Sequence, residues 1–281
     1  MPIESNLASL LERFFMKRLM SERQVSPHTI ASYRDTFRLL LQCATVKLKK
    51  EPSALVLEDL DSQFISSFLD DLEQSRKNSA RSRNLRLTAI RSFFRYAAFE
   101  EPTLSHVIQR VLSIPSKKYD QTLIGFLTKP EIEALLAAPD METWTGRRDR
   151  VFITVAVQTG LRLSEMTALC DSGVHLGRGA HVRCIGKGRK ERCVPLIKFT
   201  VPVMKAWLEE PRRGKDGYVF PNAQGERLSA DAVQHMLAKH VDVARRTCPS
   251  LEGKRVTPHV MRHTAAMELL QAAARGVTER S

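Results

Sequence analysis

Two short stretches decide how this chain folds and what it can bind: Thr159-Gly160-Leu161-Arg162-Leu163-Ser164-Glu165 and Thr257-Pro258-His259-Val260-Met261-Arg262-His263. Each presents an arginine beside an expected helix boundary, and His259 and Arg262 lie one turn apart on the same helix face. Two guanidinium forks can hold the non-bridging oxygens of one phosphodiester, and an adjacent imidazole can move protons. Together the stretches predict a phosphate-binding site built from segments far apart in the sequence.

The segment between them, Ile185-Gly186-Lys187-Gly188-Arg189-Lys190-Glu191-Arg192, is typical of a basic hairpin tip. Apolar and polar residues alternate on either side of it, over 181–185 and 192–196, which predicts two strands; 218–220 is a candidate third. The glycines permit a tight reversal. A P-loop is excluded, because the segment lacks the GxxxxGK[ST] spacing and opens no helix.

The N-terminal part of the chain predicts helices. Apolar residues recur at helical spacing over 7–15, 30–41, 60–72 and 87–97. Ser26-Pro27 supplies a serine cap and a proline at the first helical position, so it opens the second helix. We expect a compact bundle of four helices with a short extra helix near 104–112.

The stretch 113–126 has Pro115, Lys117 and Lys118 but no helical stripe, so it is the best candidate linker. Thr128-Lys129-Pro130-Glu131 then starts a helix with Glu131 at the reciprocal capping position, and Gly160 is a plausible C-cap. Further helices are expected at 199–209, 229–246 and 258–273. We therefore predict a helical domain over 1–113, a linker over 114–126, and a mostly helical domain with a small antiparallel sheet over 127–281.

The basic residues are both numerous and clustered. Lys and Arg number 44 against 31 Asp and Glu, a net charge of +13, which favours a polyanionic partner because every neutralised phosphate releases counterions. The stretch 76–95 contains no acidic residue and seven basic ones: Arg76, Lys77, Arg81, Arg83, Arg86, Arg91 and Arg95. On an amphipathic helix this favours a surface that follows DNA phosphates, and a solvated helix face is the alternative.

The five cysteines form no CxxC pair and no Cys/His cluster of zinc spacing, so no metal site is expected. Cys184 and Cys193 flank the hairpin symmetrically; two reduced thiols are favoured over a redox pair facing each other across the strands. No apolar run reaches the length of a membrane span, and the N-terminus lacks a signal-peptide pattern. We expect a cytoplasmic protein.

The ordered motifs resemble those of the tyrosine recombinases, the phage-integrase and Xer-type family. The two opening stretches resemble its arginine and His/Arg motifs, and the hairpin resembles its lysine motif. Residues 26–34 and 87–94 resemble its core-binding domain. The resemblance extends from about Leu7 to Leu270. It implies a mainly α fold with a small antiparallel β-sheet: an N-terminal, SAM-like core-binding bundle that binds DNA, followed by an α+β catalytic domain.

The resemblance also implies a role for each matched residue. The two arginines would clamp the scissile phosphate, the histidine would act as acid and base, and the hairpin lysine would protonate the leaving 5′-oxygen, with Lys190 as its less favoured substitute. The implied catalytic residues are Arg162, Lys187, His259 and Arg262, with Glu165 supporting Arg162 and His263 assigned to packing. The expected DNA contacts are Arg76, Lys77, Arg81, Arg83, Arg86, Arg91, Arg189 and Lys190.

The family reaction is transesterification through a covalent 3′-phosphotyrosyl intermediate. It implies no metal and no nucleotide cofactor, because protein cations stabilise the transition state and the phosphotyrosine bond conserves the energy for ligation. It further implies that the two domains close around double-stranded DNA and that four protomers, copies of this chain or partner recombinases, assemble on two recombining sites.

One expected residue is absent, because no tyrosine follows Tyr218. The sequence thus predicts a recombinase truncated before its nucleophile, which alone does not cleave DNA. One hypothesis is an enzyme of DNA recombination and integration, belonging to a mobile element and completed in trans by another protomer. The other is a cleavage-incompetent DNA-binding protein that occupies or regulates recombination sites. A helical RNA-binding protein is a third, more distant alternative.

Overall fold

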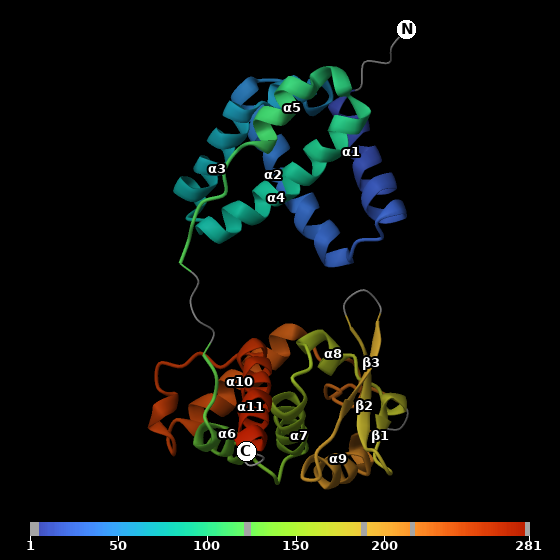
Figure 1. Cartoon of the computed structure of the whole chain (residues 1–281), viewed down its shortest axis with the longest axis vertical. Helices are drawn as coiled ribbons and strands as arrows, with labels where there is room; N and C mark the ends of the chain where they lie inside the picture. The colour runs from blue at the N-terminus through green and yellow to red at the C-terminus, as the bar shows by residue number, and fades with distance from the viewer. Residues whose placement is uncertain (1–5, 121–124, 187–189, 214–216, 279–281) are drawn as a thin grey trace. The chain divides into compact units, whose positions relative to one another are not determined.

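The computed structural model describes residues 6–120, 125–186, 190–213 and 217–278, and only the backbone of residues 212 and 272–278. The chain divides into two compact units, Met1–Gln121 and Thr122–Ser281 (Figure 1). Each unit has its own hydrophobic core. Helices dominate, and the described strands form one three-stranded antiparallel sheet, so the predicted fold class is confirmed.

The first unit is a bundle of helices. Its α-helices are α1 (Leu7–Arg13), α2 (Pro27–Leu48), α3 (Ser62–Arg76), α4 (Ala80–Glu100) and α5 (Ser105–Leu112). A π-helical segment, η1 (Phe14–Glu22), continues α1, and short 3₁₀ turns are η2 (Pro52–Ala54), η3 (Leu57–Leu60) and η4 (Pro102–Leu104). The predicted cap is present, since the Ser26 side chain accepts a hydrogen bond from the Thr29 backbone N–H at 3.3 Å.

Aromatic side chains form the centre of this first core. Phe14, Phe37 and Phe93 are buried and meet edge to face, with ring centroids 5.3 Å apart between Phe37 and Phe93. Such edge-to-face pairs add stability beyond the area they bury. Because α4 contributes Phe93 and its neighbour Phe94 to this core, one face of α4 is fixed inward, and that face determines which of its basic residues remain on the surface.

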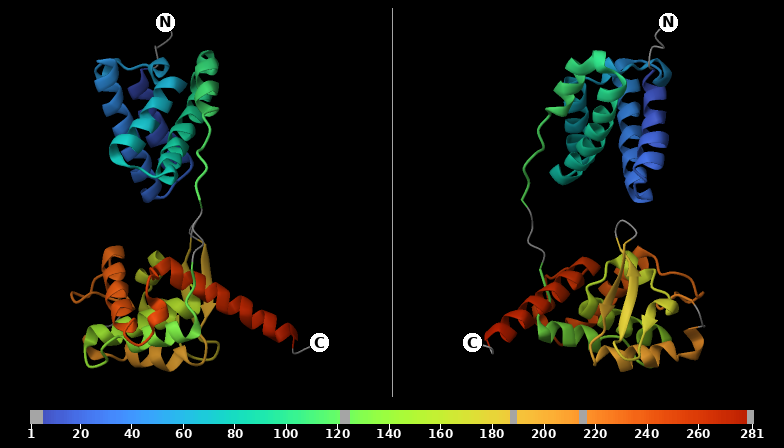
Figure 2. Two further views of the ribbon diagram at one scale, coloured as in Figure 1. Left: turned by 90° about the vertical axis from the view of Figure 1, so that its left-hand side faces the viewer. Right: turned by 45° about the vertical axis from the view of Figure 1, so that its right-hand side comes forward.

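The second unit packs its helices around α7 (Trp144–Thr159), which is buried along most of its length. The other α-helices are α6 (Lys129–Ala137), α8 (Leu163–Thr167), α9 (Thr200–Leu208), α10 (Ala230–Ala244) and α11 (Pro258–Thr278), with 3₁₀ turns η5 (Asp171–Gly173), η7 (Pro211–Arg213) and η8 (Pro249–Leu251). Helices α6, α9 and α11 contact α7. The last part of α11 projects beyond the rest of the unit (Figure 2).

The sheet has the order β1 (Val174–His175), β2 (His181–Ile185), β3 (Glu191–Pro195). The hairpin strands are present as predicted, but the candidate third strand at 218–220 is wrong: Tyr218 forms only an isolated bridge with Cys170. The register pairs Cys184 with Arg192 and Cys193 with Arg183. Side chains alternate between faces along a strand, so the two thiols point to opposite sides and do not form a redox pair.

The segment after α5 stays attached to the first unit. Ile114 is buried in the first core, and the Lys117 backbone N–H donates to Asn84 Oδ1 on α4 at 3.0 Å. Among the described residues, no helix is both long enough and apolar enough to cross a bilayer.

Candidate active site

The first arginine lies in a short connection between two helices. Helix α7 ends at Gly160, whose φ of +60° lies in the left-handed region that glycine adopts without strain. Arg162 follows as the N-cap residue of α8. A Cβ at position 160 would lie 3.1 Å from Cβ of Ala265, so the glycine also permits α11 to approach this turn. The turn thereby places Arg162 beside α11.

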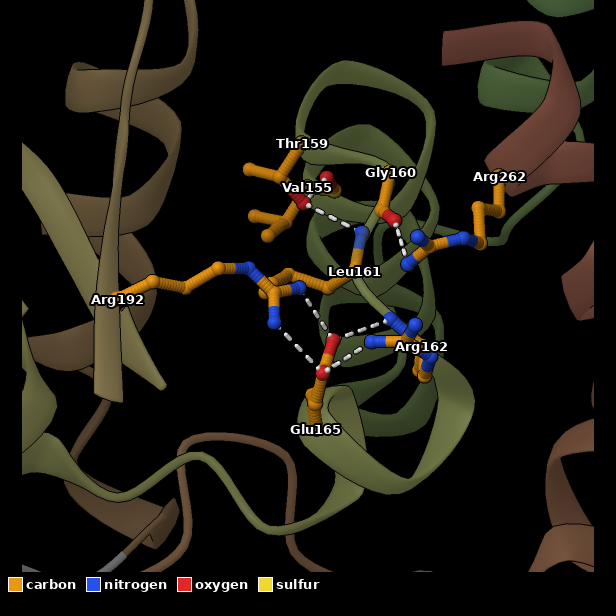
Figure 3. A network of polar contacts seen from close by, with 8 residues as sticks. All are labelled: Val155, Thr159, Gly160, Leu161, Arg162, Glu165, Arg192 and Arg262. Carbon is orange, nitrogen blue, oxygen red and sulfur yellow. Dashed lines mark hydrogen bonds and ion pairs between the residues drawn. The ribbon is translucent and has the colours of Figure 1, made fainter. Parts of the chain in front are cut away.

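A buried carboxylate holds this turn together. Glu165, whose side chain is only 2% exposed, accepts the Arg162 backbone N–H at 2.7 Å and Arg162 Nη1 at 3.1 Å. Arg192 reaches across from β3 and donates Nη1 and Nη2 to the two Glu165 oxygens at 2.9 and 2.7 Å (Figure 3). Burial alone would raise the pKa of Glu165, but these hydrogen bonds outweigh it and hold the pKa below its ordinary value. Glu165 is therefore an anion shared by two arginines.

The second arginine comes from the first turns of α11. The Thr257 hydroxyl accepts the Val260 backbone N–H at 3.3 Å, and Pro258 opens the helix. Arg262 Nη1 donates to the Gly160 carbonyl at 2.7 Å, which ties α11 to the end of α7 (Figure 3). This bond orients the Arg262 guanidinium toward the turn that carries Arg162.

The two arginines and the histidine meet in one cavity. Arg162, Arg262 and the exposed His259 line a hollow of about 330 Å³, together with Leu163, Gln234, Thr257 and Pro258. A larger hollow of about 870 Å³ is lined by His259 together with Lys254, Arg255 and the half-buried His263. These side chains present positive charge and donors and leave room for a phosphate group.

A second buried glutamate anchors the loop that leads into α11. Glu131, 1% exposed, completes the predicted capping box with Thr128 and accepts Ser250 Oγ at 2.6 Å and Lys254 Nζ at 2.8 Å. Burial alone would raise the pKa of Glu131, but its hydrogen bonds to Lys254, Ser250 and the Thr128 backbone lower it. Thr264 adds a further bond, since its buried hydroxyl accepts the Leu127 backbone N–H at 2.9 Å.

The expected hairpin residues are placed only in part. Lys187 and Arg189 lie outside the described residues, so their implied roles stay predictions. Lys190 is exposed beside the hairpin neck, where its carbonyl accepts the Gly186 backbone N–H at 2.7 Å. Among the residues described, no group of three or more His, Cys, Asp or Glu side chains is arranged to hold a metal ion.

The basic run over 76–95 divides into two groups. Arg83 was expected to contact DNA, but it does not lie on the surface. Its side chain is 6% exposed, lies 3.5 Å from Glu73 and donates to the Pro115 carbonyl. It is buried because the face of α4 that carries it packs against Glu73 of α3 and the segment around Pro115. Arg86 is half-buried and pairs with Asp35 at 3.0 Å, and Arg91 donates to Ser116 and the Ile114 carbonyl. The exposed members are Arg76, Lys77, Arg81 and Arg95.

Two residues of the site were not expected from the sequence. Arg192 was grouped with the basic hairpin, yet its side chain points toward the body of the second unit. The sequence feature that could have predicted this is its position on the strand opposite Cys184, which is buried. An arginine at such an inward position requires a buried anion, which Glu165 supplies. Gln234, an exposed residue of α10, carried no signal, because nothing in its local sequence shows which part of the unit α10 borders.

Known proteins match both units. The model of the phage integrase family matches residues 125–277, and that of the phage integrase N-terminal SAM-like domain matches residues 11–101. The integrase/recombinase y4rC of Sinorhizobium fredii is 62% identical over 268 residues, which cover 95% of this chain and 81% of that relative. The tyrosine recombinase XerC of Pelotomaculum thermopropionicum is 33% identical, covering 92% of this chain and 84% of XerC.

Solved structures show the same fold. The XerH site-specific recombinase bound to palindromic difH substrate gives a TM-score of 0.68 at 22% identity, covering 89% of this chain and 71% of XerH. A lambda integrase dimer bound to a core site gives 0.66 at 17% identity, covering 93% and 89%. With family models matched in both units and close relatives over nearly its whole length, this chain belongs to the phage integrase family of tyrosine recombinases.

Proposed function

We propose that this chain binds duplex DNA through both units and holds one scissile phosphate between Arg162 and Arg262 during site-specific recombination. The observation that carries the proposal is the cavity these arginines share with His259. Relatives of the same fold are named as bound to DNA, among them XerH on its difH substrate and lambda integrase on a core site. We assign DNA binding to 1–113 and the phosphate site to 127–281. In the linker predicted over 114–126, Ile114 and Lys117 contact the first unit.

The chemistry follows from the side chains of the cavity. Two guanidiniums stabilise the extra negative charge of a pentacovalent phosphorane without a metal or nucleotide cofactor. His259, exposed at the rim, exchanges protons with the reacting oxygens. We assign Lys187 the protonation of the leaving 5′-oxygen, since a flexible ammonium serves as both charge and acid. Exposed Arg76, Lys77, Arg81 and Lys190 contact the DNA backbone.

The remaining part of the reaction is the nucleophile, for which these 281 residues contain no tyrosine after the His259/Arg262 motif. No tyrosine follows Tyr218, Tyr96 is buried in the first core, and the Tyr218 backbone is engaged in a bridge with Cys170. A clamp and an acid–base pair still need an oxygen nucleophile in line with the leaving group. We therefore propose that a polypeptide of these 281 residues alone takes its tyrosine in trans, from a partner recombinase on the DNA.

A second candidate function rests on the same observation. A chain that binds recombination sites without a nucleophile would occupy or regulate them, and it would still act on DNA in the cytoplasm. The two candidates differ in whether a partner's tyrosine completes the reaction.

Binding and cleavage are tested separately. The chain should bind duplex DNA with an affinity that falls steeply between about 50 and 200 mM salt, as expected for several phosphate contacts. Replacing Arg162 or Arg262 by Gln should lower that salt dependence. Salt-independent binding would contradict the proposal.

A nicked suicide duplex should then trap no covalent adduct with this polypeptide alone. Adding a full-length relative whose own Arg-to-Gln change disables its clamp should yield an adduct if the tyrosine acts in trans. No adduct in the mixture, with DNA still bound, would favour the regulatory alternative.

A further inference from the structure

Arg192 belongs to the basic hairpin stretch, yet its guanidinium is directed at a buried carboxylate. It stands on β3 opposite Cys184, and its side chain is 36% exposed. Both terminal nitrogens are directed at Glu165, at 2.9 and 2.7 Å, which is the bidentate arrangement that strengthens an arginine–carboxylate pair (Figure 3). Arg192 thus bonds to the carboxylate that supports Arg162.

The neck of the hairpin is built around this guanidinium. The Gly186 backbone N–H donates to the Lys190 carbonyl at 2.7 Å, which closes the neck. A Cβ at position 186 would lie 2.6 Å from Arg192 Nη1 and 3.4 Å from Glu165 Oε1. A side chain at position 186 would therefore displace the Arg192 guanidinium from its place at Glu165. The Arg192–Glu165 pair links the hairpin neck to α8.

The net charge of the cluster shows how the Arg192–Glu165 pair affects Arg162. Arg162, Arg192 and Glu165 carry two positive charges and one negative charge, so the cluster keeps one net positive charge. Glu165 is 2% exposed and Arg192 36%, whereas the Arg162 side chain is 45% exposed and lines the cavity. Without Arg192, the buried carboxylate would be balanced by Arg162 alone, and the cluster would present no net charge to a phosphate.

We propose that Arg192 is a positioning residue for the phosphate: its fork occupies Glu165, so that Arg162 keeps its charge for the ligand, and it fixes the hairpin neck to the same carboxylate. This inference rests on the proposed function of the cavity. It makes Arg192 part of the site without contact to the phosphate.

The test compares charge removal at two places on the hairpin. Arg192→Gln should weaken binding to a duplex selected for this chain about tenfold, the size of effect seen when the hydrogen-bond partners that support metal ligands are removed. It should also lower the slope of log K against log salt by about 0.9, the value of one phosphate contact. Arg183→Gln is the matched control, because Arg183 pairs with Glu191 at 3.1 Å on the exposed face of the same two strands. The control should change affinity less than about threefold.

A double variant separates charge balance from packing. Arg192→Gln with Glu165→Gln removes the unbalanced carboxylate, so Arg162 regains its charge and the salt slope should recover. Arg192→Lys should recover it in part, because an ammonium supplies charge but not the fork. Equal behaviour of Arg192→Gln and Arg183→Gln, or no recovery in a folded double variant, would overturn the inference.

A measurement without DNA distinguishes failure of this inference from failure of the proposed function. Inorganic phosphate is titrated into the same chains while the Arg162 Nε–Hε resonance is followed, and Arg192→Gln should require about tenfold more phosphate. If the unchanged chain binds no DNA, the proposed function fails, and the phosphate titration decides for or against Arg192 alone. Equal phosphate affinity in the two chains refutes the role of Arg192.

Discussion

Replacing Gly160 by Ala tests the junction on which the candidate site depends. Gly160 has a φ of +60°, and a Cβ there would lie 3.1 Å from Cβ of Ala265 on α11. A non-glycine residue in the left-handed region costs about 1–2 kcal/mol, and overfilling a packed contact costs about 1–3 kcal/mol more. The expected loss in the free energy of unfolding is therefore about 2–5 kcal/mol.

The loss is measurable in the second unit alone. The two tryptophans of the chain, Trp144 and Trp207, both lie in that unit with ring centroids 5.5 Å apart, so urea unfolding followed by tryptophan fluorescence reports on it. Gly225→Ala is the matched control: its φ is +84°, but a Cβ there would meet nothing within 4 Å, so only the backbone term of about 1–2 kcal/mol remains. Equal losses in the two variants would refute the packing argument, and a loss below about 0.5 kcal/mol for Gly160→Ala would refute the whole reasoning.

Three further substitutions test separate parts of the chain. Arg83→Gln should destabilise the first unit by about 1–3 kcal/mol, because it removes a buried guanidinium that donates to the Pro115 carbonyl and lies 3.5 Å from Glu73. Arg81→Gln, on the exposed face of the same helix, should leave the melting temperature nearly unchanged but lower the salt slope of DNA binding by about 1; the reverse pattern would show that the surface is assigned to the wrong residues. The lowered pKa of Glu131 means that its ionised form stabilises the fold above the ordinary carboxyl pKa of about 4.3, and that this contribution is lost as the pH falls through the lower folded value. Glu131→Gln should therefore unfold more easily than the unchanged chain at pH 7, with the difference shrinking toward pH 3; a difference independent of pH would contradict the ionised assignment.

The helices were predictable because their signals are local. Ser26-Pro27, the Thr128–Glu131 capping box and Gly160 each fix a helix end through a bond or a backbone angle within a few residues, and each was found where expected. Strand β1 was missed because it has only two residues, Val174 and His175, too few for a period to show. Tyr218 was misassigned because a β-rich triplet does not reveal whether a neighbouring strand is available to it.

The sequence indicates which residues carry the chemistry far better than it indicates what holds them. Arg162 and Arg262 follow from their motifs, yet their orientation depends on bonds to Glu165 and to the Gly160 carbonyl. Of these, only the Glu165 contact is local. The Arg262 bond exists because α11 packs on α7, a tertiary contact that no spacing in the sequence records.

The same distinction explains why the charge pattern alone did not predict which arginines are exposed and which are buried. Arg81 and Arg83 stand two positions apart on α4, and the helical period turns them about 200° from each other. One is exposed and the other is buried against Glu73. Arg192 shows the same on a strand: it belongs to a run of basic residues, but its counterion, Glu165, is buried. A basic run therefore predicts a polyanionic partner for the surface as a whole, but each arginine belongs to that surface only if no buried carboxylate or carbonyl already takes its donors.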